Sequence, residues 1–284
     1  MNVPTSFKAC FPKRQADSHK GTYGTLLSVC GSYGMAGAAI LAARAAMRCG
    51  TGLVIAALPE SIYPIAGTAL PEVVFAPFTE QPAAAVVKGL TPHLQKSTAL
   101  LLGCGLGNTA ATAQLTEALF CAATCPLVLD ADGINAAARH ISILETAHPP
   151  LILTPHPKEL ARLLHTTVEH IQTDRQTAAK TAAERFDAVV VLKGHHTVIA
   201  APNSMVSVNQ TGNPGMAVAG SGDVLAGMIA GLLAQGVSPL DAARCGVYLH
   251  GAAGDLAAAR LSQHAMLPTD MLDELGTLFL QLEK

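Results

Sequence analysis

Residues 188–194 read AVVVLKG, an apolar run that ends in a lysine and a glycine. A strand that is apolar at every position has both faces buried, which is typical of the parallel sheets of α/β proteins. Residues 126–130, PLVLD, repeat the pattern and end in an aspartate. These runs predict buried parallel strands with polar residues at their carboxyl ends, where open α/β sheets bind their ligands.

Similar runs alternate with Ala/Leu-rich segments of helical period along the chain, which predicts an α/β fold with a mostly parallel central sheet and helices on both faces. Parallel strands are expected at 25–30, 53–58, 99–102, 126–129, 151–153 and 188–192, and a β-hairpin at 197–200 and 205–208. Helices are expected to start near Gly37, Thr109, Asp132, Lys158 and Thr173, and to span 221–234, 239–259 and 269–282. No low-complexity linker divides the chain, so we expect a single domain over 1–284, with residues 1–20 as an N-terminal extension.

Composition narrows the classes of partner. The chain has 18 Lys+Arg against 20 Asp+Glu, a net charge of -2, and 4% aromatic residues, so a nucleic-acid partner is not expected. No apolar run is long enough to span a membrane. Seven cysteines without paired spacing favour a reducing compartment, which predicts a cytoplasmic protein. Since 50% of the residues are hydrophobic and 13% charged, we also expect an apolar subunit interface in a homo-oligomer, with a tetramer as one form.

Two glycine-rich loops follow expected strands. The first, CGSYGMAG at 30–37, has backbone NH groups that could cradle a phosphate, or it is a tight turn that needs glycine. The second, GCGLGNT at 103–109, is not a dinucleotide fingerprint, because Asn108 stands where the third small residue should be. It remains a candidate backbone wall beside a ligand.

Two further loops carry ionisable residues. In LDADGIN, 129–135, Asp130 at the strand tip is the better site candidate, whereas Asp132 is expected to cap the following helix. In TPHPKEL, 154–160, prolines on both sides of His156 stiffen the strand exit and fix where His156 and Glu159 point. His156 is therefore a functional candidate, although a lone histidine is often only a surface residue.

The strongest signal is NPGMAVAGSGDVLAGMIAGLLA, 213–234. Gly220, Ser221, Gly222 and Asp223 stand at the start of a long apolar helix. NH groups at a helix start bind anions, and a carboxylate beside them can take a proton from a hydroxyl while a phosphoryl group is transferred. The alternative is an aspartate that only stabilises the helix dipole, by about 0.3 to 1 kcal/mol.

This anion site, on a late helix of a parallel α/β protein without the P-loop pattern, resembles the ribokinase-like superfamily. Within it, motifs that run in order along the chain look like those of the ADP-dependent NAD(P)H-hydrate dehydratases. They are HKGTYGTLLSVCGSYGMAGAAILAARAAMRCGTGLV (19–54), LDADGIN (129–135), LTPHPKELARLL (153–164), VVLKGHHTVI (190–199), GNPGMAVAGSGDVLAG (212–227) and LPTDML (267–272).

The resemblance implies a repair reaction in which hydrated NADH or NADPH returns to the normal cofactor, while ADP is converted to AMP and phosphate. Phosphorylation of the ring hydroxyl would be followed by elimination of phosphate, with Mg2+ as cofactor and ADP as co-substrate. Asp223 would be the base, and Gly220, Ser221 and Gly222 the anion hole.

Other sites follow from the same resemblance. The nucleotide would be bound by Lys193, Gly194, His195, His196 and Thr197, with Asn213 to Gly222 completing its site. The hydrated dinucleotide would be held by Ala39, Gly105 and His156, and Glu159 would organise magnesium through water. Related sugar kinases carry Asn at the position of His156. Cys104 departs from the family, whose members often have Pro there.

Two other functions stay open from the sequence. One is a small-molecule kinase of the same fold, acting on a thiazole or pyrimidine alcohol. The other is an inactive nucleotide-binding subunit, against which the intact Asp223 argues.

Overall fold

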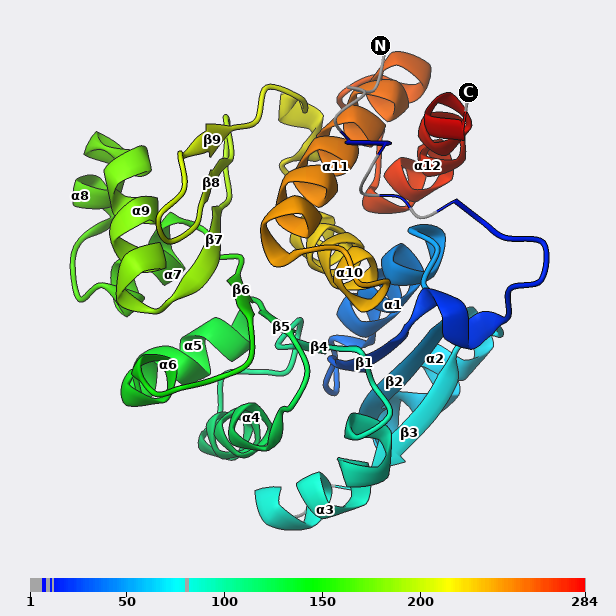
Figure 1. The fold of residues 1–284 in the computed structure, drawn as a ribbon, viewed down its shortest axis with the longest axis vertical. Helices are drawn as coiled ribbons and strands as arrows, with labels where there is room; N and C mark the ends of the chain where they lie inside the picture. The colour runs from blue at the N-terminus through cyan, green and yellow to red at the C-terminus, as the bar shows by residue number, and fades with distance from the viewer. Residues whose placement is uncertain (1–6, 9–10, 12, 80–81, 284) are drawn as a thin grey trace.

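The computed structural model describes residues 7–8, 11, 13–79 and 82–283. Its centre is one sheet with the strand order β3-β2-β1-β4-β5-β6-β7-β8-β9 (Figure 1). The strands are β1 (Thr25–Val29), β2 (Leu53–Pro59), β3 (Val74–Phe78), β4 (Ala99–Leu102), β5 (Leu127–Leu129), β6 (Leu151–Leu153), β7 (Ala188–Leu192), β8 (Val198–Ala200) and β9 (Ser207–Val208). Strands β1 to β7 are parallel, and the hairpin β8–β9 adds antiparallel strands at one edge.

Helices cover both faces of the sheet, as the sequence predicted (Figure 1). One face carries α1 (Ala36–Arg48), α2 (Tyr63–Ala69), α10 (Ser221–Ala234), α11 (Pro239–Leu261) and α12 (Pro268–Glu283). The other carries α3 (Ala83–Leu94), α4 (Ala110–Ala122), α5 (Asp132–Arg139), α6 (Ser142–Glu145), α7 (Pro157–Leu163), α8 (Val168–Thr173) and α9 (Arg175–Arg185). The predicted α/β class with a mostly parallel sheet is confirmed.

Both faces of the central strands are buried, because helices cover both sides of the sheet. Successive side chains of a strand point to opposite sides and so enter different cores. On β1, Leu26 packs into one core and Leu27 into the other, and neither has accessible surface. This explains why the strands lack the polar alternation of a half-exposed sheet.

The helix α10, whose N-terminus is the predicted anion site, lies against α1 at very short range. A Cβ atom at Gly227 would stand 2.2 Å from the carbonyl oxygen of Ala42, so only glycine permits this approach. The small residues of α10 therefore serve helix packing, which fixes the position of its N-terminus.

Residues 59–98 contain an edge strand and two helices that the sequence did not predict. Pro77 lies within β3, and a proline in an apolar run argues against a central strand. Here the proline is tolerated because β3 is an edge strand paired only with β2. The helix expected to start near Thr173 begins two residues later, at Arg175, as α9, but the short helix α8, which ends at Thr173, was not predicted.

Asp132 does not cap α5, contrary to expectation. The N-cap residue is Ala131, and no side chain forms a cap hydrogen bond there. The carboxylate of Asp132 instead accepts a hydrogen bond of 2.8 Å from the NH of Gly107. It thereby ties the loop after β4 to α5.

The expected N-terminal extension lies partly outside the described residues. Of its described part, Phe7 contacts the ring of Tyr248, and Phe11 contacts the ring of Phe279. These contacts place that part against α11 and α12. Among the described helices, none is long and apolar enough to cross a membrane.

Candidate active site

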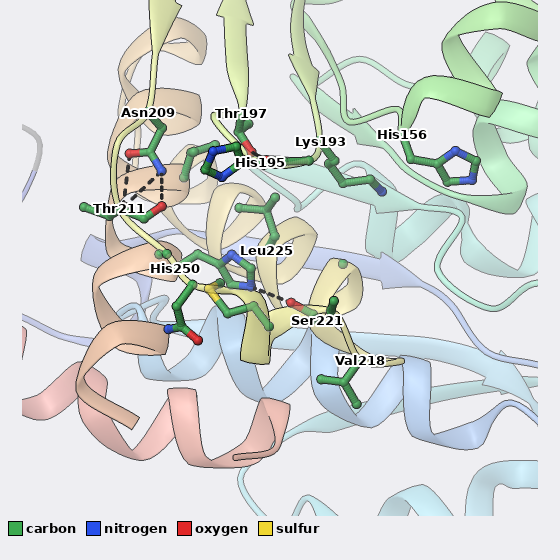
Figure 2. Close-up of a pocket in the computed structure, with 18 of the residues that line it drawn as sticks. His156, Lys193, His195, Thr197, Asn209, Thr211, Val218, Ser221, Leu225 and His250 are labelled. Atoms are coloured by element: carbon green, nitrogen blue, oxygen red, sulfur yellow. Dashed lines mark hydrogen bonds between the residues drawn. The ribbon is translucent and has the colours of Figure 1, made fainter. Parts of the chain in front are cut away.

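The carboxyl ends of β5 to β7 open into a cavity of about 670 Å³, closed on its other side by α10 and α11 (Figure 2). It brings together most of the residues that the sequence singled out. These are His156, Glu159, Lys193, Gly194, His195, His196, Thr197, Asn213, Gly220, Ser221, Gly222 and Asp223.

The N-terminus of α10 forms one wall of the cavity. Gly220 precedes the helix with a φ of 94°, and a Cβ there would come within 2.6 Å of Leu41. The NH of Ser221 donates to the carbonyl of Val218. The NH groups of Gly222 and Asp223 have no acceptor among the described residues, as expected in a first helical turn. These two NH groups are the ones available to an anion.

Asp223 lies in the first turn of α10 and lines the cavity. Burial and, to a smaller extent, the charge of Asp130 raise the pKa of its carboxyl from 3.8 to about 6, although Lys193 opposes the rise. A carboxylate with a pKa near 6 is ionised at neutral pH yet holds a proton well. It is suited to act as a general base.

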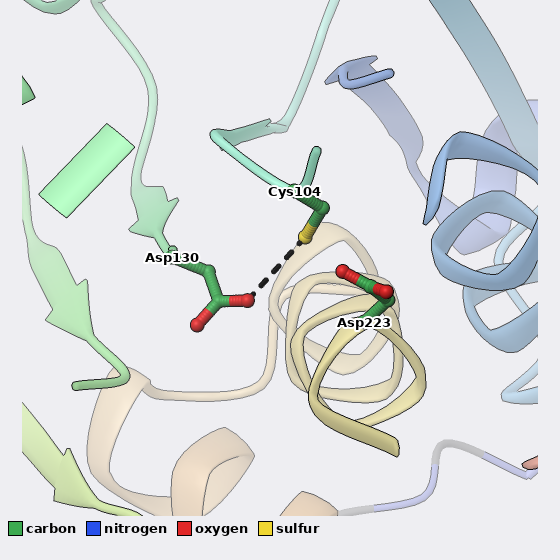
Figure 3. Close-up of side chains that lie close together, drawn as sticks. All are labelled: Cys104, Asp130 and Asp223. Atoms are coloured by element: carbon green, nitrogen blue, oxygen red, sulfur yellow. Dashed lines mark hydrogen bonds between the residues drawn. The ribbon is translucent and has the colours of Figure 1, made fainter. Parts of the chain in front are cut away.

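Asp223 belongs to a cluster with Asp130 and Cys104 (Figure 3). The side-chain ligand atoms of the three residues lie within 4.8 Å of one another. The thiol of Cys104 donates to Asp130 over 3.5 Å, and the hydroxyl of Thr154 donates to the same carboxylate over 2.7 Å. Asp130, which is 1% exposed, is thus held rigidly at the tip of β5.

Lys193 is the cation of this cluster. Its Nζ lies 2.6 Å from Oδ1 of Asp130 and 3.9 Å from Oε2 of Glu159. Burial would lower the pKa of Lys193, but the two carboxylates outweigh burial and raise it. A Cβ at Gly222 would stand 3.6 Å from Nζ, so the ammonium group lies beside the start of α10. Lys193 therefore brings positive charge to the start of α10.

His156 is the N-cap of α7. Its Nδ1 accepts from the NH groups of Lys158 and Glu159, so the neutral ring carries its proton on Nε2. Nε2 lies 3.3 Å from Oε1 of Glu159, and the NH of His156 donates to Oε2 over 2.7 Å. Burial and the charge of Lys193 lower the pKa of His156, which favours this neutral form. Both ring nitrogens are thus bound by protein groups, but 45% of the side chain is exposed, so a ligand can contact the ring.

The loop after β7 is held from outside the cavity. Arg175 donates to the carbonyls of Leu192 and Lys193, and it lies against Gly194. This leaves His195 and His196 exposed, with their rings stacked at 3.8 Å. Across the cavity, Asn213 is held by Asp255 through a hydrogen bond of 3.0 Å.

Sequence reasoning missed His250, which lies on α11 and lines the cavity (Figure 2). Its Nε2 lies 3.3 Å from the hydroxyl of Ser221. Burial lowers the pKa of His250 to about 4, so the ring is neutral. A histidine inside the apolar stretch YLHGAAG, 248–254, is the signal that could have identified it.

Two predicted substrate residues do not line this cavity. Ala39 is 3% exposed, and Gly105 is buried on the loop after β4. Gly105 directly follows Cys104, whose thiol lies beside Asp223. It is therefore close in sequence to the cluster, on the side of Asp223 that faces β4.

The sequence of this chain is similar to those of a known enzyme family. The family described as NAD(P)H-hydrate dehydratase matches residues 26–276. The bifunctional NAD(P)H-hydrate repair enzyme Nnr of Moorella thermoacetica is 47% identical over 96% of this chain and 52% of its own length. The ADP-dependent (S)-NAD(P)H-hydrate dehydratase of Neisseria meningitidis is 45% identical over 90% of this chain and 84% of its own length. This chain thus spans about half the length of the Moorella relative.

Solved structures agree with these relatives. The ADP/ATP-dependent NAD(P)H-hydrate dehydratase of Bacillus subtilis, co-crystallised with ATP and Mg2+, has a TM-score of 0.84 and 34% identity, covering 98% of this chain and 97% of that one. A ribokinase-like superfamily protein of Enterococcus faecalis has a TM-score of 0.87 and 26% identity, covering 99% and 95%. The fold is therefore ribokinase-like, and the chain belongs to the NAD(P)H-hydrate dehydratase family.

Proposed function

We propose that this chain dehydrates hydrated NADH or NADPH at the expense of ADP, giving NAD(P)H, AMP and phosphate. The observation that carries the proposal is Asp223, a carboxylate with a raised pKa beside unpaired NH groups at the start of a helix. The names of the Neisseria and Bacillus relatives supply the substrate class.

The chemistry follows from what the residues can do. Asp223 takes the proton of the ring hydroxyl while the hydroxyl oxygen attacks the terminal phosphorus of ADP. The bond between that phosphorus and the bridging oxygen breaks, and AMP leaves with the oxygen. The NH groups of Gly222 and Asp223, with the ammonium of Lys193, stabilise charge on the transferred phosphoryl group. The lone pair of the ring nitrogen then expels phosphate, which breaks the carbon–oxygen bond and leaves an iminium ion. Loss of a proton from the neighbouring ring carbon to water then restores the dihydronicotinamide.

The donor set around Lys193 fits a magnesium ion that keeps its waters. Asp130 and Glu159 offer only oxygen, which Mg2+ prefers, and both lie at the cavity. Both oxygens of Glu159 already contact His156, so we propose that Glu159 reaches the metal through water. Bound Mg2+ would neutralise phosphate charge.

The nucleotide is proposed to occupy the cavity bounded by 193–197 and 213–222. The exposed, stacked rings of His195 and His196 support this, since they offer an aromatic surface to a base. Ala39, Gly105 and His156 remain proposed contacts of the hydrated dinucleotide.

We further propose one domain over 1–284 and a cytoplasmic homo-oligomer. The exposed apolar side chains Ile65 and Val74, on α2 and the edge strand β3, support a subunit contact at this edge.

The test mixes the protein with chemically hydrated NADPH, Mg2+ and ADP, ATP or no nucleotide. We expect the dihydronicotinamide absorbance to return with ADP, together with free phosphate and AMP. Equal rates without nucleotide would refute the phosphorylation mechanism. A stable phosphoester as product would favour the kinase alternative, and bound nucleotide without turnover of any hydroxylated ligand would favour an inactive subunit.

A further inference from the structure

A second cavity of about 640 Å³ lies between α5, α7 and the loop that precedes α4. We call it the basic groove, and define it by Arg139, Lys158, Arg162, Asn108 and Asn135. No Asp or Glu is among the described residues that line it. In a chain of net charge -2, this is a local concentration of positive charge.

The cations of the basic groove are exposed. Within the described residues, Arg139, Lys158 and Arg162 form no ion pair with a carboxylate, whereas Arg185 and Arg260 elsewhere on the surface do.

Neutral amides hold the two guanidinium groups instead. Arg139 donates to Oδ1 of Asn108 over 2.6 Å, and Arg162 donates to Oδ1 of Asn135 over 2.6 Å. An amide fixes a guanidinium group while leaving its charge and its other NH donors for a ligand. The arrangement is suited to a phosphate anion.

The basic groove adjoins the proposed substrate side of the site. The NH of Lys158 donates to His156, and the carboxylate of Asp132 joins α5 to Gly107, two residues after Gly105. The proposed nucleotide residues, by contrast, line the other cavity, toward β8, β9 and α11. A dinucleotide that contacts Gly105 and His156 would therefore pass close to α5 and α7, away from the proposed ADP site.

We propose that the basic groove binds the phosphate groups of the hydrated dinucleotide, so that Arg139 and Arg162 determine affinity for this substrate. The inference rests on the proposed function. Both hydrates carry a pyrophosphate, and only the NADPH hydrate carries a 2′-phosphate, so the two substrates identify which phosphate is bound.

The test is the double variant Arg139→Gln/Arg162→Gln. We expect its KM for the hydrate to rise about 10-fold or more, because charge-assisted hydrogen bonds to phosphate are lost, while kcat and the KM for ADP stay within about twofold. A rise with both hydrates identifies the pyrophosphate, and a rise with NADPH hydrate alone identifies the 2′-phosphate. Arg162→Lys, which keeps the charge, should retain most of the affinity.

The matched control is Arg48→Gln/Lys88→Gln, which removes the same charge from exposed sites on α1 and α3. The hydrate KM should rise with salt in wild type and control but much less in the groove variant, since screening weakens exposed charges. An unchanged KM in the groove variant, or an equal rise in the control, overturns the proposal.

Direct binding keeps this inference separate from the proposed function. NADPH is titrated into each folded variant, and binding is followed by nicotinamide fluorescence. If wild type binds NADPH about 10-fold more tightly than the groove variant, phosphate binding in the basic groove is supported even without hydrate turnover. Equal or absent binding in both, without a difference in KM, overturns it.

Discussion

Replacing Asp223 by Asn should slow turnover strongly and stabilise the protein. The amide keeps the size of the side chain but cannot accept the hydroxyl proton. We expect the rate of hydrate repair to fall by about 10² to 10⁴, with nucleotide binding retained.

The gain in stability follows from the raised pKa of Asp223. A rise from 3.8 in the unfolded chain to about 6 in the fold makes the folded state bind the proton more tightly. The stabilising effect of that proton is complete below pH 3.8 and is lost as the pH rises to about 6. Above that, the ionised carboxylate costs the fold about 3 kcal/mol. A neutral Asn avoids this cost.

The assay compares thermal unfolding of wild type and Asp223→Asn at two pH values. At pH ~7.5 the variant should gain up to about 3 kcal/mol, or roughly 5 to 10 °C in melting temperature. At pH ~4.5 the gain should shrink to about 1 kcal/mol. The kcat/KM of wild type should fall below a pH of about 6, as Asp223 of the free enzyme becomes protonated.

Asp241→Asn is the matched control, because Asp241 occupies the same position in the first turn of α11 but is exposed. It should leave turnover unchanged and alter stability by less than about 1 kcal/mol. Near-normal turnover of Asp223→Asn would refute its role as base. If the variant were no more stable than wild type at pH ~7.5, the burial argument would be wrong.

Three further predictions concern other parts of the molecule. Lys193→Met should lower kcat by about 10² and also lower the melting temperature, since it leaves Asp130 and Glu159 without their cation. Lys193→Arg should retain partial activity. A normal kcat with only a lower melting temperature would show that the ion pair is purely structural. His156→Ala should raise the KM for hydrate more than the KM for ADP, and it should cost about 1 kcal/mol of stability because the helix cap is lost. His156→Asn should keep the cap and still raise the KM for hydrate. An unchanged KM for hydrate in both variants would show that His156 does not contact the substrate. Light scattering at micromolar concentration should give the mass of an oligomer, and a monomeric mass would reject the proposed subunit interface.

The sequence was sufficient for those features that depend on neighbours along the chain. The continuous apolar runs at 126–129 and 188–192 predicted parallel strands, because burial of both faces leaves no room for polar residues. The prolines around His156 placed the start of α7 within one residue. The glycines before Asp223 predicted an unusual helix start, and Gly220 precedes α10 with a φ of 94°.

The sequence misled where a local rule competed with a tertiary contact. Asp132 has the residue type of a helix cap, but the free NH of Gly107 lies within reach and takes its carboxylate instead. The edge strand β3, which contains Pro77, was not predicted; a proline is tolerated there because an edge strand pairs on one side only.

The chemical properties of the candidate active site depend on the tertiary structure. Three features of the site depend on residues that lie far apart in the chain. They are the raised pKa of Asp223, the position of Lys193 between two carboxylates, and the contact of His250 with Ser221. Burial and charge act through distance in space, and that distance is set by the register of neighbouring strands and by the packing of α10 on α1. A single sequence records the residue types at these positions, but the separations between them arise only when the sheet assembles.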